Sequence, residues 1–435
     1  MIKAPIGLQE LRRRIYRKAK SEETHRFWGI FVHIAKIETL AEAYRIAKRN
    51  GGAPGIDGQS FEDIEALGLA TFLATLRDEL LTDSYQPQAN RPVEVLKENG
   101  KVRVLQIPCI RDRVVQGALK LILEAIFEAD FCPNSYGFRP KRSPHRALAE
   151  VRRSVLRRMS MVIDVDLSNY FDTICHAVLL DKIAQRVQDP QVLHLVKQII
   201  KVGGPVGVAQ GGPFSPLAAN IYLNEVDWDF DAIRRKTAQD DYEAVNYHRF
   251  ADDIVITVSG HHSKRGWAER ALQRLEEQLT PLGVKLNREK TQVVDTLKGD
   301  AFGFLGFELR RVRNRSGKGY FILMTPKKKA RQAIKAKVRD IIHTGGALPA
   351  QEIIARINAA LAGWVNYFRV GNASRAFSEV RDYVEMKVRT LLTRRKRRRK
   401  RSVGWRRWSN AYLYGVLGLF WDWKIHPLPS ARGYA

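Results

Sequence analysis

The stretch Phe250-Ala251-Asp252-Asp253, followed by the run IVITV at residues 254–258, decides how this chain is interpreted. β-branched residues favour strands and Asp tolerates turn geometry, so the sequence predicts a strand, a tight turn and a second strand. Two adjacent carboxylates at the tip of such a hairpin are suited to holding a divalent cation. An acidic turn that only faces water is the common structural alternative.

A second acidic strand is predicted over residues 162–166, where the sequence is VIDVD. Its alternation places Asp164 and Asp166 on one face and the apolar residues on the other. A carboxylate at this strand end would repel the two acids of the hairpin unless a cation neutralised all three. A metal site is therefore the simplest explanation, and a solvated strand edge with negative charges is the alternative.

Further motifs follow the order found in one protein family. They are residues 111–116 (RDRVVQ), 135–140 (SYGFRP), 166–172 (DLSNYFD), 210–216 (QGGPFSP), 250–253 (FADD), 286–291 (LNREKT) and 304–307 (FLGF). In these residues the chain resembles the reverse transcriptases, and among them the proteins encoded by bacterial and organellar group II introns. The resemblance extends from residues 55–58 (GIDG) to the basic run near residue 400.

The resemblance implies a right-hand polymerase of the α/β (α+β) class. Its fingers and palm would carry an antiparallel palm sheet, and a helical thumb would follow. The expected parts are an N-terminal extension with the start of the fingers at 1–90, the fingers and palm at 91–318, a helical thumb or maturase domain at 319–402, and a basic-aromatic C-terminal tail at 403–435.

The acidic residues are the candidate catalytic centre. Two divalent ions can stabilise both the attacking and the leaving oxygens when a primer 3′-hydroxyl attacks an α-phosphate. Carboxylate oxygens suit Mg²⁺. The resemblance makes Asp166, Asp252 and Asp253 the catalytic residues and the ligands of two Mg²⁺ ions, with Asp164 as a neighbour rather than a ligand.

The triphosphate of an incoming nucleotide has to be met by cations and polar groups. Residues 93–103 predict two short strands around a turn, and Lys97 and Arg103 flank that turn, so both are candidate phosphate contacts; a solvated hairpin is the alternative. The resemblance adds Gln210, in a Gly-rich loop, as a nucleotide or template contact. It also adds Lys290, which would help protonate the departing pyrophosphate.

Three further nucleotide contacts, Asn169, Tyr170 and Phe171, are implied by the motif that begins at Asp166. An aromatic ring at Phe171 would lie under the sugar, clash with a ribose 2′-hydroxyl and so favour deoxynucleotides. An ordinary core aromatic is the alternative, because Phe is among the residues most often buried.

Three positions depart from the family pattern. Phe250 stands where Tyr is commonest and therefore lacks a hydroxyl donor. Ala209 stands where Pro is usual, and Phe214 where an aliphatic residue is typical. We expect an unusually shaped loop around Gln210 and an intact capacity for polymerisation.

The charge of the chain indicates a nucleic-acid partner. It carries 74 Lys and Arg residues against 46 Asp and Glu among 435, a formal charge of +28, which attracts polyanions. Residues 310–408 hold 28 of these cations and only 5 acids. Apolar residues at helical spacing over 353–361 and 377–392 predict helices in this part.

Eight consecutive cations near residue 400 are the candidate nucleic-acid contacts. A localisation signal or a solvated helix end would have the same composition, but beside a polymerase thumb we expect these residues to bind RNA phosphates. They are Arg394, Arg395, Lys396, Arg397, Arg398, Arg399, Lys400 and Arg401.

The cysteine content and hydropathy bear on location. Cys109, Cys132 and Cys175 are too few and too scattered for a disulfide framework or a Cys-paired zinc module, which predicts a reducing compartment. No apolar run approaches about 18 residues, so no membrane span is predicted. We expect a cytoplasmic bacterial ribonucleoprotein without an obligate protein partner and without the endonuclease domain of many relatives.

The expected function is that of an RNA-directed DNA polymerase, a nucleotidyltransferase that extends a DNA primer on an RNA template with deoxynucleoside triphosphates. By resemblance it would also bind intron RNA and assist splicing as a maturase. Two alternatives stay open. One is a domesticated relative in phage defence or DNA repair; the other is an RNA-binding splicing factor with an idle polymerase, against which the intact acidic set argues.

Overall fold

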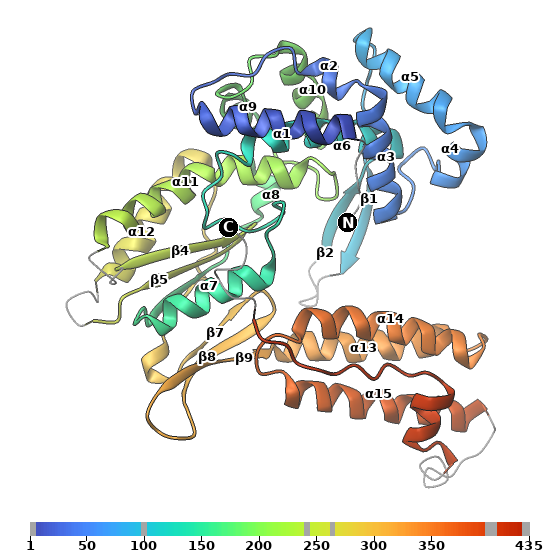
Figure 1. Cartoon of the computed structure of the whole chain (residues 1–435), viewed down its shortest axis with the longest axis vertical. Helices are drawn as coiled ribbons and strands as arrows, with labels where there is room; N and C mark the ends of the chain where they lie inside the picture. The colour runs from blue at the N-terminus through green and yellow to red at the C-terminus, as the bar shows by residue number, and fades with distance from the viewer. Residues whose placement is uncertain (1–5, 97–101, 239–243, 262–265, 396–406, 429–435) are drawn as a thin grey trace. The chain divides into compact units, whose positions relative to one another are not determined.

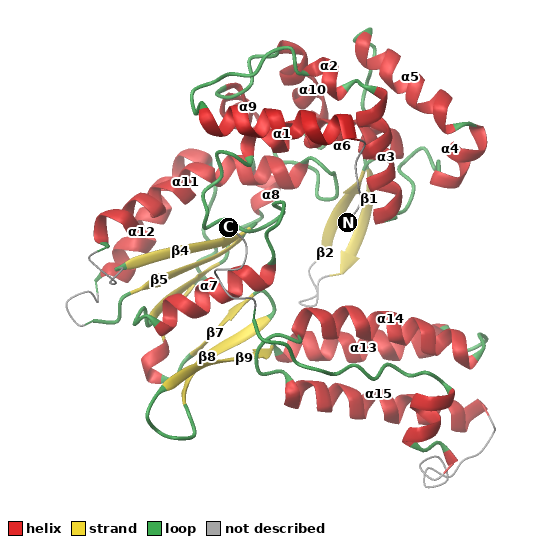
Figure 2. Cartoon of the chain, in the orientation of Figure 1, coloured by secondary structure: helices red, strands yellow, loops and turns green. Residues whose placement is uncertain are grey.

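The structure is a computed structural model, and it describes residues 6–96, 102–238, 244–261, 266–395 and 407–428. Helices and antiparallel strands make up most of the described chain (Figure 1 and Figure 2). Two compact units are present, and each is assembled from separate stretches of the sequence.

The first unit contains Met1–Ser143, Val165–Ile256 and Gly266–Thr291. Its central helix is α6 (Ile110–Phe127), most of whose residues are buried. A helix that is apolar on nearly all sides has to be covered on nearly all sides. Figure 1 shows other helices of the unit gathered around it.

Two N-terminal helices cover α6. Helix α1 (Ile6–Ser21) is fixed by Arg12, whose Nε donates to the carbonyl of Leu121 over 2.9 Å. Helix α3 (Ile37–Asn50) crosses α6 at Gly117, where an added Cβ would lie 3.1 Å from the Cβ of Ala43. Glycine at this crossing therefore lets the two helices approach closely.

The unit contains further helices and a pair of strands. They are α2 (Phe31–Ile34), α4 (Phe61–Leu67), α5 (Leu69–Leu81), β1 (Arg91–Leu96), β2 (Val102–Ile107), α8 (Tyr170–Thr173), α9 (His176–Ala184), α10 (Pro190–Lys201), α11 (Ser215–Thr237), α12 (Trp267–Leu279) and the 3₁₀ helix η2 (Thr280–Leu282). Strands β1 and β2 pair antiparallel, from Arg91 opposite Ile107 to Leu96 opposite Val102.

A four-stranded sheet in the order β4-β5-β3-β6 carries the predicted acidic strands. Its strands are β3 (Met161–Val165), β4 (Val245–Phe250), β5 (Asp253–Val258) and β6 (Gln292–Asp295). Every residue of β5 after Asp253 is buried, as expected for a strand covered on both faces. The predicted strand, turn and strand around the acidic pair are confirmed, and so is the strand that leads to Asp166.

The second unit contains Pro144–Asp164, Thr257–Arg265 and Gln292–Ala435. A three-stranded antiparallel sheet in the order β7-β8-β9 precedes three long helices. Its remaining elements are α7 (Pro144–Leu156), η3 (Thr296–Lys298), β7 (Ala301–Phe304), β8 (Phe307–Arg313), β9 (Tyr320–Pro326), α13 (Lys328–Thr344), α14 (Ala350–Phe368), α15 (Ser374–Arg395) and the π-helical turn η4 (Tyr412–Val416).

Helices α13, α14 and α15 share one apolar core, which confirms the helices predicted from spacing over 353–361 and 377–392. Residues 407–428 complete that core, because Trp408 and Leu419 are buried within it and Trp423 packs against it. The chain after α15 is also tied to α14, since Asn358 Nδ2 donates to the carbonyl of Gly418 over 2.7 Å.

Candidate active site

The acidic pair lies at a two-residue turn between β4 and β5. Ala251 is buried and has a φ of +57°, a left-handed conformation that costs a non-glycine residue about 1–2 kcal/mol. The side chains of Asp252 and Asp253, which follow it, are exposed. The turn therefore buries the strained residue Ala251 and exposes both carboxylates to solvent.

Asp166 lies directly after β3, the neighbour of β5 in the sheet. Its carbonyl accepts a hydrogen bond from the backbone N–H of Asn287 over 2.8 Å, and its own N–H donates to Thr291 Oγ1 over 3.4 Å. The segment 285–291, which contains the predicted motif LNREKT, therefore braces the backbone of Asp166 from the side.

Lys290 lies beside Asp166, and its Nζ donates to the carboxylate Oδ2 over 3.1 Å. Both side chains are well exposed, at 60% for Lys290 and 40% for Asp166. The pair therefore has open access to solvent and to a ligand.

A buried tyrosine, Tyr170, lies four positions after Asp166. Burial raises the pKa of Tyr170 well above its usual value, and the charges of Asp227 and Asp252 add to the rise. The Tyr170 hydroxyl donates to the carbonyl of Ala219 over 2.6 Å.

The donor chemistry of these acids fits Mg²⁺. Asp166, Asp252 and Asp253 offer accessible carboxylate oxygens, and Mg²⁺ is commonly held by one or two carboxylates together with substrate phosphates and water. Within the described ranges, no group of three or more His, Cys, Asp or Glu residues forms a ready-made metal cage. A site completed by phosphates needs no such cage.

The segment 134–139 lies along the hairpin. The backbone N–H of Tyr136 donates to the carbonyl of Arg249 over 2.8 Å, and the N–H of Arg249 donates to the carbonyl of Asn134 over 3.0 Å. A Cβ on Gly137 would overlap the backbone nitrogen of Ala251. Only glycine therefore fits where this segment passes the acidic turn.

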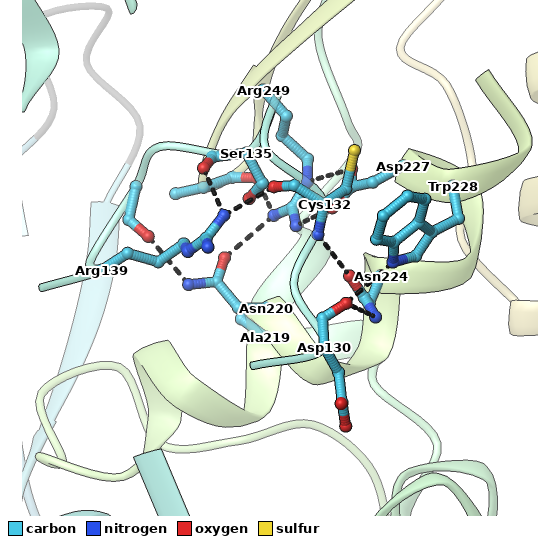
Figure 3. A network of polar contacts seen from close by, with 12 residues as sticks. Asp130, Cys132, Ser135, Arg139, Ala219, Asn220, Asn224, Asp227, Trp228 and Arg249 are labelled. Atoms are coloured by element: carbon cyan, nitrogen blue, oxygen red, sulfur yellow. Dashed lines mark hydrogen bonds and ion pairs between the residues drawn. The ribbon is translucent and has the colours of Figure 1, made fainter. Parts of the chain in front are cut away.

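Arg139, the last residue of this segment, ties the segment to Glu128. Its guanidinium forms two hydrogen bonds of 2.9 Å to the carboxylate of Glu128 and donates to the carbonyls of Cys132 and Ser135. These contacts are drawn in part in Figure 3. The predicted motif SYGFRP is thus a rigid support for the hairpin.

A buried network lies behind the turn (Figure 3). Arg249 is fully buried, and its Nε and Nη2 donate to the two oxygens of Asp227 over 2.7 and 2.5 Å. Its Nη1 donates to Asn220 Oδ1 and to the carbonyl of Ala251, each over 3.0 Å. Asn220 in turn donates to the carbonyl of Gly137 over 2.8 Å. Burial opposes the charged guanidinium, but Asp227 outweighs it and the pKa of Arg249 is raised.

The Gly-rich loop at Gln210 is tied at two points. The side-chain Nε2 of Gln210 donates to Asp172 Oδ1 over 3.0 Å. The carbonyl of Gln210 accepts a hydrogen bond from the backbone N–H of Gln106, in β2, over 3.1 Å. At Gly211 the φ is +135°, and an added Cβ would lie 2.9 Å from the carbonyl oxygen of Gln106. The loop is therefore joined to the β1–β2 hairpin through its backbone.

The other predicted nucleotide contacts have diverse surroundings. Asn169 is exposed in a left-handed conformation, and Tyr170 is buried. Phe171 is half-buried, with its ring edge-on to that of Tyr170 at 5.5 Å. Lys97 lies outside the described residues, and for Arg103 the structure describes the backbone, paired with Val95.

Most of the predicted basic run, Lys396 to Arg401, also lies outside the described residues. Arg394 is exposed at the end of α15. Arg395 donates to the carbonyls of Gly346 and Leu348 in the loop that joins α13 to α14. Arg395 therefore links the end of α15 to the loop between α13 and α14.

Sequence reasoning missed three residues that support the site: Asn220, Asp227 and Arg249. Gly137 and Asp172 lie within the predicted motifs SYGFRP and DLSNYFD, but their supporting contacts were not predicted. A signal for Arg249 was present, because a cation inside a strand of buried residues has to find an acidic partner. Nothing in the sequence indicates that this partner lies in α11.

Comparisons with known proteins agree with these features. Residues 95–309 match the family described as reverse transcriptase (RNA-dependent DNA polymerase), and residues 331–411 match the group II intron, maturase-specific domain. Protein YkfC of Escherichia coli strain K12 is 36% identical over 363 residues, which cover 74% of this chain and 94% of YkfC.

Two further relatives carry the intron in their names. The group II intron-encoded protein LtrA of Lactococcus lactis subsp. cremoris is 26% identical over 374 residues, 70% of this chain and 61% of LtrA. Nuclear intron maturase 1, mitochondrial, of Arabidopsis thaliana is 34% identical over 105 residues, 23% of this chain and 15% of that protein. The chain thus spans about three fifths of LtrA.

A chain with both matches falls into one class, the reverse transcriptases that carry a maturase domain. The chain belongs to the family of group II intron reverse transcriptase/maturase proteins. None of the helices among the described residues has the length and apolar character needed to cross a bilayer.

Proposed function

We propose that this protein is an active RNA-directed DNA polymerase that extends a DNA primer on an RNA template with deoxynucleoside triphosphates. The observation that carries the proposal is the exposed Asp252-Asp253 turn, fixed from behind by buried contacts and adjacent in the sheet to the strand that ends before Asp166. A domain match to reverse transcriptases supports it.

Asp166, Asp252 and Asp253 would hold two Mg²⁺ ions. When bound, such ions stabilise the attacking 3′-oxygen and the leaving oxygen of an in-line displacement. The protein's own residues supply the rest. The Nζ of Lys290 lies 3.1 Å from Asp166 Oδ2. From this position Lys290 would protonate the leaving pyrophosphate.

The nucleotide pocket would be completed by the loop and the segment after Asp166. Gln210 is oriented by Asp172 and joined to β2 through its carbonyl, so it would form a fixed wall against the nucleotide or template. Phe171 would exclude a ribose 2′-hydroxyl by bulk, and Asn169 lies exposed at the same turn. Lys97 and Arg103 would contact the triphosphate from the β1–β2 hairpin.

In this proposal β1 and β2 belong to the fingers, the sheet β4-β5-β3-β6 is the palm, and α13 to α15 form the thumb or maturase domain. The proposed boundaries of these domains are residues 91, 319 and 403, although residues 407–428 pack into the core of α13 to α15. The maturase match and the cations of residues 310–408 support binding of intron RNA and assistance to splicing. Such a protein would act in the bacterial cytoplasm as a ribonucleoprotein.

The test is primer extension on an RNA template by wild type and by Asp252→Ala. We expect the variant to lose at least about 100-fold in rate, because the substitution removes a carboxylate that acts on the reacting centre. Asp300→Ala removes an exposed acid outside the site and should extend like wild type. Equal rates for wild type and Asp252→Ala would overturn the proposed function.

A further inference from the structure

Arg249 connects three parts of the first unit to the acidic turn. From β4 its guanidinium reaches Asp227 and Asn220, both in α11, and the carbonyl of Ala251 in the turn itself. Asn220 extends the connection to the carbonyl of Gly137. Each of these side chains is almost completely buried.

The turn needs such a restraint. Ala251 adopts a φ of +57°, which glycine adopts freely but alanine resists. If no donor held the carbonyl of Ala251, the peptide bond between Ala251 and Asp252 would rotate to a less strained conformation. The side chain of Asp252 would then change its position. The charged donor from Arg249 holds the carbonyl in place, because hydrogen bonds from ionised groups are shorter and stronger than neutral ones.

Arginine is the side chain that can make this set of contacts. Its Nε, Nη1 and Nη2 donate four hydrogen bonds, to Asp227, Asn220 and the carbonyl of Ala251. Lysine has three donors on one atom and cannot match a planar fork of this kind. The arrangement is therefore specific in geometry as well as in charge.

On the basis of the proposed function, we propose that Arg249 is a positioning residue: through Ala251 it holds the carboxylates of Asp252 and Asp253 ready to bind divalent cation. Asp227 keeps the guanidinium charged and oriented, and Asn220 sets its distance from the Gly137 segment. Loss of this support should weaken cation binding about 10–100-fold, the usual effect of losing an outer-shell partner.

The informative variant replaces the pair rather than one member. Removing Arg249 alone would leave Asp227 as a buried charge without its partner, and the protein could unfold for that reason. The double substitution Arg249→Met with Asp227→Leu removes both charges and keeps comparable volume, which is often tolerated. The matched control is Arg274→Met with Asp229→Leu. Arg274 also donates to both carboxylate oxygens of its acidic partner, over 2.9 and 2.6 Å, but this pair lies away from the turn.

Cation binding is measured directly on the full chain, by the free Mn²⁺ signal in electron paramagnetic resonance without nucleotide. We expect the Arg249/Asp227 variant to bind Mn²⁺ at least tenfold more weakly than wild type, with unchanged affinity for primer–template in the absence of metal and a cooperative thermal transition. The control pair should bind Mn²⁺ like wild type. Wild-type Mn²⁺ affinity in a folded Arg249/Asp227 variant would overturn the proposal.

Gly137→Ala tests the same idea if the double variant does not fold. Its Cβ would displace the backbone of Ala251 while the Arg249–Asp227 pair remains, so Mn²⁺ affinity should again fall. The control is Gly266→Ala, where an added Cβ meets nothing within 4 Å. Unchanged Mn²⁺ affinity in folded Gly137→Ala would contradict the positioning role. Full extension by Asp252→Ala would instead contradict the proposed function, so the two failures are distinguishable.

Discussion

Lys290 Nζ and Asp166 Oδ2 lie 3.1 Å apart as a hydrogen-bonded pair, although 124 positions separate the two residues in the sequence. The pair joins the motif LNREKT to the strand end that carries the first acid of the site. The pair is exposed, so its contribution to stability is small. In the proposed mechanism Lys290 would protonate the leaving pyrophosphate.

Replacing Lys290 with Gln should slow nucleotide addition with little effect on folding. An exposed ion pair contributes about 0–1 kcal/mol, whereas a general acid typically contributes about 10²–10⁴-fold in rate. Single-turnover incorporation with saturating nucleotide measures the effect. Lys285→Gln removes a neighbouring exposed cation and serves as the control; equal losses in both variants would mean that only local charge matters.

Phe171→Ala should admit ribonucleotides. The half-buried ring is proposed to fill the space of a 2′-hydroxyl, and loss of one such pocket wall is worth roughly 10–200-fold in discrimination. The measurement is the ratio of kcat/KM for a deoxynucleotide and the matching ribonucleotide. Phe171→Tyr keeps the bulk and should keep the ratio. Unchanged discrimination in the alanine variant would show that Phe171 serves only the core.

Asp130 should make stability depend on pH in a specific direction. Burial raises the pKa of this carboxyl to about 6, although Arg186 opposes the rise. The folded protein therefore takes up a proton near pH 6, whereas the unfolded chain does so only near pH 4. Folding is accordingly favoured as pH falls from 7 to 5, by about 1 kcal/mol from this group.

Urea unfolding of wild type and Asp130→Asn at pH 7 and pH 5 isolates the effect, because every other titrating group is shared. The free energy of unfolding of wild type, relative to that of Asp130→Asn, should be about 1 kcal/mol higher at pH 5 than at pH 7. A difference that stays constant across this range would show that Asp130 titrates normally.

Neutralising residues 396–401 to Gln should weaken binding of intron RNA and make it less dependent on salt. Each phosphate contact contributes about 0.7–0.9 to the slope of log K against log salt, so six contacts would change the slope by roughly 4–5. Replacing the same residues with six lysines keeps the charge and should keep the slope. An unaltered slope in the Gln variant would place RNA binding elsewhere on the chain.

Local patterns made part of this fold predictable. The β-branched run after Asp253 and the alternation before Asp166 predicted strands, and both are present as β5 and β3. Helical spacing likewise predicted α14 and α15. These features depend on residues close together in the sequence, where the period of burial is visible.

The supports of the site were not predictable in the same way. The partner of Arg249 lies 22 positions away in a helix. Trp423 packs against the core of α13 to α15, a contact that no local pattern indicates. The resemblance assigned Lys290 to the site, but not its hydrogen bond to Asp166 across 124 positions. Sequence shows that a buried cation needs an acid, but only the assembled fold selects which acid it is.

The most direct measurement is anomalous diffraction from crystals of the full chain with primer–template, incoming nucleotide and Mn²⁺. The account predicts two Mn²⁺ peaks about 3.5–4 Å apart, bridged by the carboxylates of Asp166 and Asp252 and completed by nucleotide phosphates. Peaks that contact the phosphates but neither Asp166 nor Asp252 would contradict it.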